Sequence, residues 1–269
     1  MGRRYDTVSF LSDFGHQDEF VGVVKSVIRD IAPHATVIDL THEVTAHDVR
    51  AGSLALARAI PYVASGVVLA VVDPGVGTDR RAVAVEVAEG EGVFVGPDNG
   101  LIAAAVAIAG GAGRCVALTN DKFHLEGAGS TFDGRDVFGS VAGHLCNGVD
   151  LEELGDVIDP VGLRPGMLPI SREEDGAIVA EVLWIDRYGN VQLNVDVDEI
   201  GPYGDPVQLA FQDKTRVVRR AAAYEFVTPG EVGIVIDAYG LVSLAADRSS
   251  AAETLRLRPG DAVIIRSVD

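Results

Sequence analysis

The segment GVVLAVVDPGVGTDRRAVAVEVAEG, residues 66–90, decides the fold class. It runs from an apolar, β-branched stretch through a Pro-Gly turn and two arginines into a second β-branched stretch. Runs of this kind, bounded by turn residues, are typical of strands. Four other stretches share the pattern and are expected to be strands: TVSFLSDFG (7–15), ATVIDLTH (35–42), GVFVGPDNG (92–100) and RCVALT (114–119).

Helical patterns lie between some of these strands, at residues 18–31, 45–60 and 100–109. Such alternation predicts βαβ units around a mainly parallel sheet. The second helix is expected to begin with Thr45, because Asp48 three positions later approximates a capping box. A Pro- and Gly-rich stretch, residues 159–176, then ends the alternation. The short strands that follow it, with no clear helices between them, predict a small antiparallel sheet or barrel.

The composition is that of an ordinary soluble globular protein, with 269 residues, 48% hydrophobic and 23% charged. No apolar run approaches the roughly 20 residues of a membrane span, and no secretory h-region is recognised, so we expect a cytoplasmic protein without a membrane partner. The formal net charge of −18 argues against a nucleic-acid partner. We interpret Cys115 and Cys146 as buried small hydrophobes, because neither belongs to a Cys-x-x-Cys pair.

Polar residues end several of the expected strands. Asp13 follows FLS, Asp73 follows AVV, and Asp98 with Asn99 follows VGP. In open α/β sheets, ligands bind outside the carboxyl ends of the strands, so these residues predict a shared crevice. Each of them can also be an ordinary turn residue that bonds its own backbone.

Asp73 and the two arginines after it form the most informative group. Pro74 forces Asp73 into an extended conformation, which directs its carboxylate beyond the sheet edge. Side chains alternate along a strand, so only one of Arg80 and Arg81 should reach Asp73. A structural ion pair that closes a hairpin is the alternative interpretation.

Two further polar clusters allow a functional or a structural interpretation. STFDGRDVFG (130–139) contains Asp133 and is either a helix start or a site for an anion or a water. WIDRYGNVQLNV (184–195) contains Asp186 and Asn190 around a turn that, taken alone, is typical of a hairpin.

The common cofactor and metal motifs are not found in the sequence. No G-x-G-x-x-G follows a strand, and the Walker A, G-x-S-x-G and H-E-x-x-H patterns do not occur. This argues against NAD, ATP, serine hydrolysis and zinc. We therefore expect no metal site and no cofactor.

Six motifs, in order along nearly the whole chain, together resemble the S-adenosylmethionine hydroxide adenosyltransferases, relatives of the fluorinases and chlorinases. They are LSDFG (11–15), THEVTAHDV (41–49), VVDPGVGTDRR (71–81), VGPDNG (95–100), TFDGRDVF (131–138) and WIDRYGN (184–190). The resemblance implies a three-layer α/β domain with a mainly parallel sheet at residues 1–160, a linker at 161–176 and a smaller antiparallel β-barrel domain at 177–269. It also implies a homotrimer with the substrate at the subunit interface.

The implied reaction is attack of hydroxide on the 5′ carbon of S-adenosylmethionine, which is the substrate and not a cofactor, to give adenosine and L-methionine. Asp73, Arg80 and Asp133 are the implied catalytic residues. A carboxylate beside an arginine can orient a water and stabilise its hydroxide character. Halogenating relatives carry an uncharged residue in place of Asp73, because an anion there repels halide.

One catalytic position departs from the family pattern. The hydroxide-using members have a histidine in TFHGRD, where this chain has Asp133. Two carboxylates around one arginine could still hold a water, or the activity could be weakened or altered.

The resemblance assigns five residues to substrate binding. Asp13 matches the ribose-binding aspartate, and Asp186 matches the acid that meets the methionine ammonium. Asn190 and Phe226 match adenine-side positions. His47 stands where halogenases place an aromatic residue against the ribose, a looser correspondence.

Three other functions remain open from the sequence alone. A chlorinase-type halogenase would form 5′-chloro-5′-deoxyadenosine from chloride. A non-catalytic module would bind adenosine or S-adenosylmethionine without turnover. A nucleosidase would release free adenine.

Overall fold

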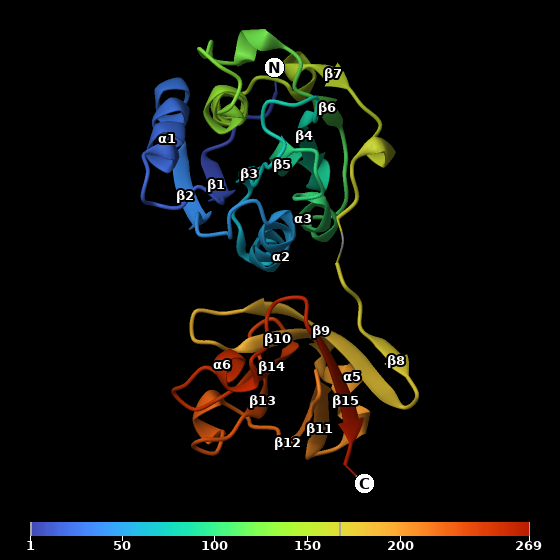
Figure 1. The fold of residues 1–269 in the computed structure, drawn as a ribbon. Coiled ribbons are helices and arrows are strands. Elements are labelled where there is room, and N and C mark those ends of the chain that lie inside the picture. Colours follow the sequence, from blue (N-terminus) through green and yellow to red (C-terminus); the bar gives the residue numbers. More distant parts are fainter. Residues whose placement is uncertain (1, 167, 269) are drawn as a thin grey trace. The chain divides into compact units, whose positions relative to one another are not determined.

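A computed structural model describes residues 2–166 and 168–268 of the chain. The chain divides into two compact units, Met1–Met167 and Leu168–Asp269. Figure 1 shows helices and strands alternating in the first unit and mainly strands in the second. The predicted fold class is confirmed: an α/β unit with a mostly parallel sheet precedes a smaller antiparallel, barrel-like unit.

The first unit is built on a seven-stranded sheet with the order β2-β1-β3-β5-β4-β6-β7. The pairs β2/β1, β1/β3 and β3/β5 are parallel, whereas β5/β4, β4/β6 and β6/β7 are antiparallel. The strand bounds are β1 (Thr7–Ser12), β2 (Thr36–Thr41), β3 (Gly66–Val71), β4 (Ala82–Val87), β5 (Gly92–Pro97), β6 (Cys115–Ala117) and β7 (Asp156–Val157). β5 therefore separates the two strands that flank the Pro-Gly turn.

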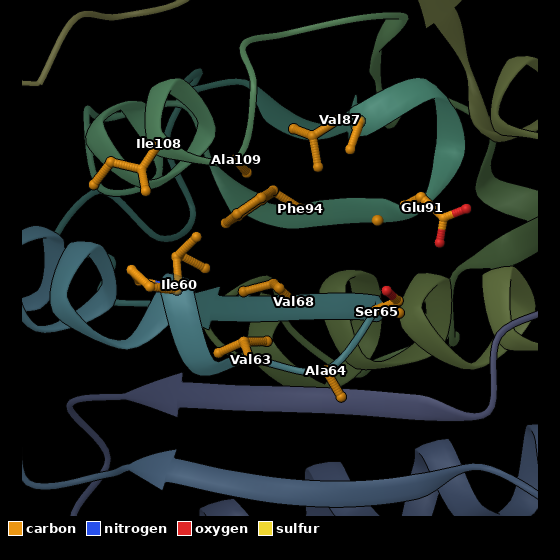
Figure 2. Close-up of a pocket in the computed structure, with 14 residues that line it drawn as sticks. Ile60, Val63, Ala64, Ser65, Val68, Val87, Glu91, Phe94, Ile108 and Ala109 are labelled. Atoms are coloured by element: carbon orange, nitrogen blue, oxygen red, sulfur yellow. The ribbon is translucent and has the colours of Figure 1, made fainter.

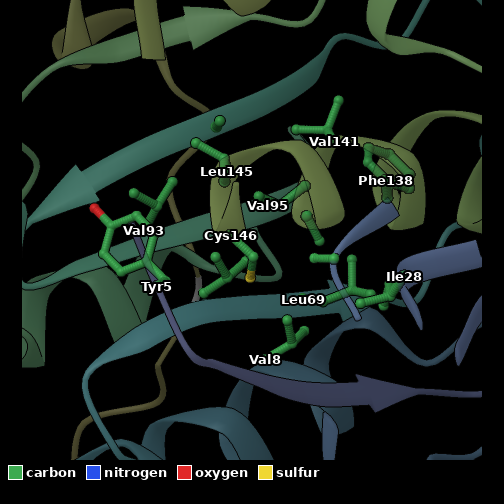
Figure 3. Packing of buried hydrophobic residues seen from close by; sticks show 14 of the residues in the cluster. Tyr5, Val8, Ile28, Leu69, Val93, Val95, Phe138, Val141, Leu145 and Cys146 are labelled. Carbon is green, nitrogen blue, oxygen red and sulfur yellow. The ribbon is translucent and has the colours of Figure 1, made fainter. Parts of the chain in front are cut away.

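Helices cover both faces of this sheet. α1 (Phe20–Ile31) and α4 (Ser140–Cys146) pack on one face, and α2 (Val49–Ala59) and α3 (Ala103–Ile108) pack on the other. Alternation along β3 directs Leu69 towards α1 and α4, while Val68 and Ala70 face α2 and α3. Figure 3 shows Leu69 among Val8, Ile28 and the residues of α4. β3 is therefore buried on both faces, which explains its continuous apolar sequence.

The predicted start of α2 was wrong. The helix begins at Val49, and its N-terminal cap is Asp48, whose Oδ1 accepts a hydrogen bond of 2.8 Å from the backbone N–H of Ala51. His47 has a left-handed backbone with φ of 67°, which a right-handed helix does not allow. Thr45 thus lies outside the helix.

The segment after Asp133 forms a helix, which is one of the two interpretations that the sequence allowed. Gly134–Gly139 is a π-helical turn that continues directly into α4. π-Helical turns often occur at functional sites. The interpretation of this cluster as a helix start was therefore correct as far as it went.

The cysteines behave as expected. Cys115 and Cys146 are free and buried. Burial raises the pKa of the Cys115 thiol to about 11 and that of Cys146 to about 12. Both therefore remain neutral thiols inside the apolar layers.

The second unit is an antiparallel sheet with the order β12-β11-β15-β9-β10-β14-β13, and β8 pairs with β9. A bridge between Arg220 and Ile234 joins the segment after β12 to β13, so the sheet nearly closes on itself. Its elements are β8 (Arg172–Glu174), β9 (Ala177–Ile185), β10 (Val191–Asp196), α5 (Val197–Ile200), β11 (Val207–Phe211), β12 (Lys214–Val218), β13 (Gly233–Ile236), β14 (Leu241–Ala245), α6 (Ala251–Leu255) and β15 (Ala262–Ser267). Within the described residues, the helices are all too short or too polar to cross a bilayer.

Removing a large side chain from the β3 layer should destabilise the first unit. Leu69 is 0% exposed, so Leu69→Ala should lower the free energy of unfolding by about 2–5 kcal/mol through lost burial and a residual cavity. Leu125→Ala deletes the same atoms where the side chain is 37% exposed, and its cost should stay below about 1 kcal/mol. Urea titration followed by circular dichroism measures both, and equal costs would contradict this packing.

Candidate active site

The candidate site begins at the carboxyl edge of the parallel strands. β1 and β3 are neighbours, with Ser12 paired to Val71. Asp13 follows β1 directly, and Asp73 follows β3 after one further residue. The sheet therefore brings these two predicted residues to the same edge, where α/β folds bind their ligands.

The Arg80 guanidinium lies between the carboxylates of Asp73 and Asp133. Its Nε lies 3.0 Å from Oδ1 and 2.8 Å from Oδ2 of Asp73, and its Nη2 lies 2.5 Å from Oδ2. The same Nη2 donates to Oδ2 of Asp133. The side chains of Asp73, Arg80 and Asp133 are 5%, 12% and 20% exposed. The three predicted catalytic residues thus form one mostly buried cluster.

A tight turn after β3 fixes Asp73. Its Oδ1 accepts a hydrogen bond of 3.2 Å from the Gly75 N–H, and its carbonyl accepts one of 3.3 Å from Val76. Gly77 has φ of 77°, and a Cβ there would lie 3.1 Å from the Ser130 carbonyl oxygen. Glycine therefore lets the turn approach the segment that carries Asp133.

The LSDFG motif meets the segment after Asp133 through close aromatic packing. A Cβ on Gly134 would lie 2.7 Å from the Phe14 ring, so this contact requires glycine. Phe14 also packs edge-on against Phe132, with ring centroids 5.9 Å apart. In the same segment, the ring of Phe138 has its centre 5.1 Å from the Arg80 guanidinium carbon. Three motifs that are distant in sequence therefore converge here.

Arg80 remains charged in this cluster. Burial acts to lower its pKa, but the hydrogen bond and charge of Asp73 and the charge of Asp133 outweigh burial, so the pKa of Arg80 is raised. Arginine is a fixed cation in such a site. Arg80 can therefore donate hydrogen bonds in this cluster but cannot accept a proton, whereas the two carboxylates can.

Arg81 pairs with a different acid, as strand alternation predicts. Its Nη2 lies 2.6 Å from Oδ2 of Asp98, which is 5% exposed. Oδ1 of Asp98 accepts a hydrogen bond of 2.8 Å from the Arg164 N–H, and Arg81 also donates to the Gly162 carbonyl. Asp98 therefore joins β5 to the segment that follows the α/β core, which is a structural role.

The predicted ribose-binding residues also lie together. Oδ2 of Asp13 accepts a hydrogen bond of 2.8 Å from the backbone N–H of His47. The backbone of His47 is left-handed where it donates this N–H to Asp13. The contact uses the backbone of His47, so its imidazole, which belongs to an exposed residue, is not required to hold Asp13.

The remaining predicted residues belong to the second unit. Oδ1 of Asp186 accepts hydrogen bonds of 2.9 Å from the N–H groups of Tyr188 and Asn190, and its Oδ2 accepts one of 2.8 Å from Asn190 Nδ2. Gly189, with φ of 84°, completes the turn. Phe226 is 70% exposed. The unit therefore presents a turn that is hydrogen-bonded around a carboxylate, and an exposed aromatic side chain.

The sequence patterns did not predict a second turn with the same hydrogen bonds, which is centred on Asp237. Oδ1 of Asp237 accepts hydrogen bonds of 2.8 and 3.1 Å from the N–H groups of Tyr239 and Leu241, and Gly240 has φ of 78°. Gln192 supplies the amide, with Nε2 2.5 Å from Oδ2 of Asp237. The two turns share the sequence pattern I-D-x-Y-G, in IDRYGN (185–190) and IDAYGL (236–241), which could have predicted the second turn.

An apolar cavity in the first unit is lined by other residues. It has a volume of about 360 Å³ and is lined by residues such as Ile60, Val68, Phe94 and Ile108. Figure 2 shows the Glu91 carboxylate near the Ser65 end of this cavity. None of the predicted site residues contributes to its lining.

Metal-ligating side chains do not gather in the part of the chain that the structure describes. Across residues 2–166 and 168–268, there is no group of three or more His, Cys, Asp or Glu side chains arranged to hold a metal ion. The acids of the site instead face an arginine.

Comparison with known proteins identifies the family. The model of the SAM hydroxide adenosyltransferase N-terminal domain matches residues 8–155, and that of the C-terminal domain matches residues 180–264. The chain belongs to the SAM hydroxide adenosyltransferase family. The resemblance seen in the six motifs is thereby confirmed.

Individual relatives support the same family assignment. A protein from Salinispora tropica named (R)-S-adenosyl-L-methionine hydrolase is 40% identical, covering 94% of this chain and 95% of its own. A fluorinase from Actinoplanes sp. (strain N902-109) is more distant, at 23% identity over 96% of each chain. The crystal structure of an uncharacterized conserved protein from Thermotoga maritima is 33% identical and superposes with a TM-score of 0.88, covering 96% of this chain and 99% of that one.

Arg80 should be irreplaceable by lysine in this hydroxide adenosyltransferase family member. A single ammonium cannot reproduce the planar fork that contacts two carboxylates, so Arg80→Lys should lower the free energy of unfolding by about 1–3 kcal/mol. Arg172→Lys alters an arginine whose side chain is 68% exposed, and should change it by less than about 0.5 kcal/mol. Urea denaturation of both variants tests this, and equal stability of Arg80→Lys and the wild type would refute the bridging role.

Proposed function

We propose that this protein hydrolyses S-adenosylmethionine to adenosine and L-methionine. The observation that carries the proposal is the Arg80 guanidinium held between the carboxylates of Asp73 and Asp133. The family and the name of the 40% identical relative support the same reaction. A cytoplasmic location is part of this proposal.

The reaction is a displacement at saturated carbon. The oxygen of a bound water forms a bond to the 5′ carbon, opposite the sulfur, while the carbon–sulfur bond breaks. Its electron pair moves to the sulfonium sulfur, which leaves as the neutral thioether of methionine. Because sulfonium is already a good leaving group, the protein mainly has to align and desolvate the nucleophile.

The water must lose a proton in this reaction, and Asp73 is our candidate acceptor. The two carboxylates and the guanidinium can orient the water before the attack. Arg80, as a fixed cation, stabilises negative charge that develops on the oxygen. A positioned carboxylate is a suitable general base. No metal or cofactor enters this scheme.

The charge of Asp73 also favours water over halide. A chloride or fluoride nucleophile arrives as an anion, and a mostly buried carboxylate repels it strongly in a medium of low dielectric constant. Water is neutral, so the carboxylate does not repel it. This argues for hydrolysis rather than halogenation, and the more distant relation to the fluorinase is consistent with it.

Substrate binding is assigned to both units. We infer that Asp13 accepts hydrogen bonds from the ribose hydroxyls, with His47 alongside. Asp186 would meet the methionine ammonium, and Asn190 and Phe226 would contact adenine. Phe226 is 70% exposed in one chain, which supports the proposal that a homotrimer forms and that substrate lies at its subunit interface.

Removing the Asp73 carboxylate should abolish most turnover. Purified protein is incubated with S-adenosylmethionine in H₂¹⁸O, and adenosine and methionine are followed by chromatography and mass spectrometry. We expect ¹⁸O in adenosine, and a kcat about 10²- to 10⁴-fold lower for Asp73→Ala, because a positioned base contributes this much. Unlabelled adenosine, or free adenine instead, would overturn the proposal.

A matched control comes from the other buried acid. Asp98→Asn alters an aspartate that is also 5% exposed and paired with an arginine, but outside the site. Its kcat should stay within about threefold of the wild type.

Chloride in the same assay should give no 5′-chloro-5′-deoxyadenosine. Ligand-induced thermal stabilisation without product would instead indicate a binding module.

Asp133 can be tested by restoring the histidine of the family pattern. Asp133→His keeps a group that can contact a water, so its kcat should remain within about tenfold of the wild type. Asp133→Ala removes that group and should lower kcat by about 10²-fold. Steady-state kinetics distinguish the two, and wild-type turnover by Asp133→Ala would exclude a catalytic role.

A further inference from the structure

His42 lies at the centre of a buried polar network beside the LSDFG turn. Its side chain is 0% exposed. Nδ1 lies 2.7 Å from the Ser12 hydroxyl, and Nε2 lies 3.2 Å from Oδ1 of Asp39. The ring also packs edge-on against Phe10, with centroids 4.6 Å apart. β1, β2 and the turn after β1 all contribute to this network.

The residue types are those of a serine hydrolase triad, but the arrangement is not catalytic. In such triads the serine faces Nε2 and the acid faces Nδ1, and here these contacts are exchanged. Ser12 is also 0% exposed, so its hydroxyl cannot reach a substrate. Ser12 and His42 therefore do not form a nucleophile and its base.

The network holds both ends of the turn that carries Asp13. The Ser12 hydroxyl accepts a hydrogen bond of 3.3 Å from the Phe14 N–H. At the far end, the Gly15 N–H donates to the His42 carbonyl at 2.7 Å. Asp13 lies between these two anchors, and its carboxylate is held in addition by His47.

The partners favour one protonation state of His42. The Ser12 oxygen accepts from Phe14, so its own proton can be donated to Nδ1, which must then carry no hydrogen. The single proton of the neutral ring is then on Nε2, which lies within ion-pair distance of Asp39 Oδ1 but outside hydrogen-bond geometry. Lys25 Nζ lies 2.9 Å from Oδ2 of Asp39 and completes the chain.

Burial reinforces this state. It lowers the pKa of His42, the contact with Asp39 opposes the shift, and the charges of His16 and Lys25 add to it, so the pKa is below its ordinary value. Because the folded-state pKa is lower than the unfolded one, the favourable contribution is complete above the ordinary histidine pKa of about 6.5. It is lost as the pH falls through the folded-state value.

We propose that neutral His42 is a positioning residue for substrate binding: through Ser12 it fixes the turn that presents Asp13 to the substrate ribose. This rests on the proposed function. A protonated ring would place a hydrogen on Nδ1 and displace the Ser12 proton from its acceptor. The Ser12 oxygen would then have to accept from both Nδ1 and the Phe14 N–H, and its own buried proton would be left without an acceptor, which weakens the anchor of the turn although Asp13 itself is unchanged.

The test separates binding from chemistry. We would measure kcat and KM for S-adenosylmethionine, and the Kd of adenosine by calorimetry, for wild type, His42→Ala, His42→Asn and Ser12→Ala. KM and Kd should rise about tenfold in His42→Ala, with kcat changed less than about threefold, because a misplaced binding group costs affinity. Ser12→Ala, a smaller change, should show the same split. His42→Asn retains an acceptor near Nδ1 and should restore KM to within about threefold of the wild type.

The pH profile and a second histidine supply the controls. Wild-type KM should rise as the pH falls through the folded-state pKa of His42, which lies below the ordinary value of about 6.5, and this rise should be reduced in His42→Asn, which cannot titrate at this position. His144→Ala removes another histidine whose pKa burial lowers, packed 5.0 Å from Phe123, and should leave KM unchanged.

The possible failures are distinguishable. A wild-type protein that releases no adenosine contradicts the proposed function. Normal wild-type turnover with unchanged KM in both His42→Ala and Ser12→Ala overturns the positioning role. An equal rise in KM for His144→Ala would show a general loss of stability, which also overturns it.

Discussion

The ion cluster of Arg80 with Asp73 and Asp133 is the interaction on which the site depends. Each carboxylate is mostly buried, and an unpaired charge in such a place costs several kcal/mol. One guanidinium satisfies both, because its planar fork offers donors in two directions. The cluster therefore also fixes the distance between the turn after β3 and the segment before the π-helical turn. The geometry of the proposed catalytic site and its local stability therefore have the same origin.

This cluster carries one more negative than positive charge, and that excess determines which chemistry suits it. A neutral water can approach such a site, whereas an anionic nucleophile is repelled. The sulfonium substrate is cationic at the reacting group, so under the proposed function the excess also favours substrate binding. The motif resemblance places a histidine at the position of Asp133 in hydroxide-using relatives, and an aspartate at that position strengthens this bias. The substitution is therefore compatible with hydrolysis while moving the site further from halide chemistry.

Local rules predicted the part of the structure that neighbouring residues determine. Apolar runs and turn residues located the strands, and alternation separated Arg80 from Arg81, which reach different acids. The start of α2 was misplaced because the left-handed backbone of His47 cannot be read from propensity. The network of His42 was missed for another reason. Its partner Ser12 is 30 positions away, and only the parallel pairing of β1 and β2 makes them neighbours.

The second unit shows how a repeated turn can acquire different roles. In both turns an aspartate oxygen binds two backbone N–H groups, so the backbone design is the same. The partner of the second oxygen differs. The Asn190 amide, within the turn, donates to Oδ2 of Asp186, whereas the Gln192 amide, from β10, donates to Oδ2 of Asp237. Gln192 is 2% exposed, so the second turn is joined to the sheet interior. The first turn keeps its amide at its own partly exposed tip, and this leaves it the better placed of the two to meet a polar ligand.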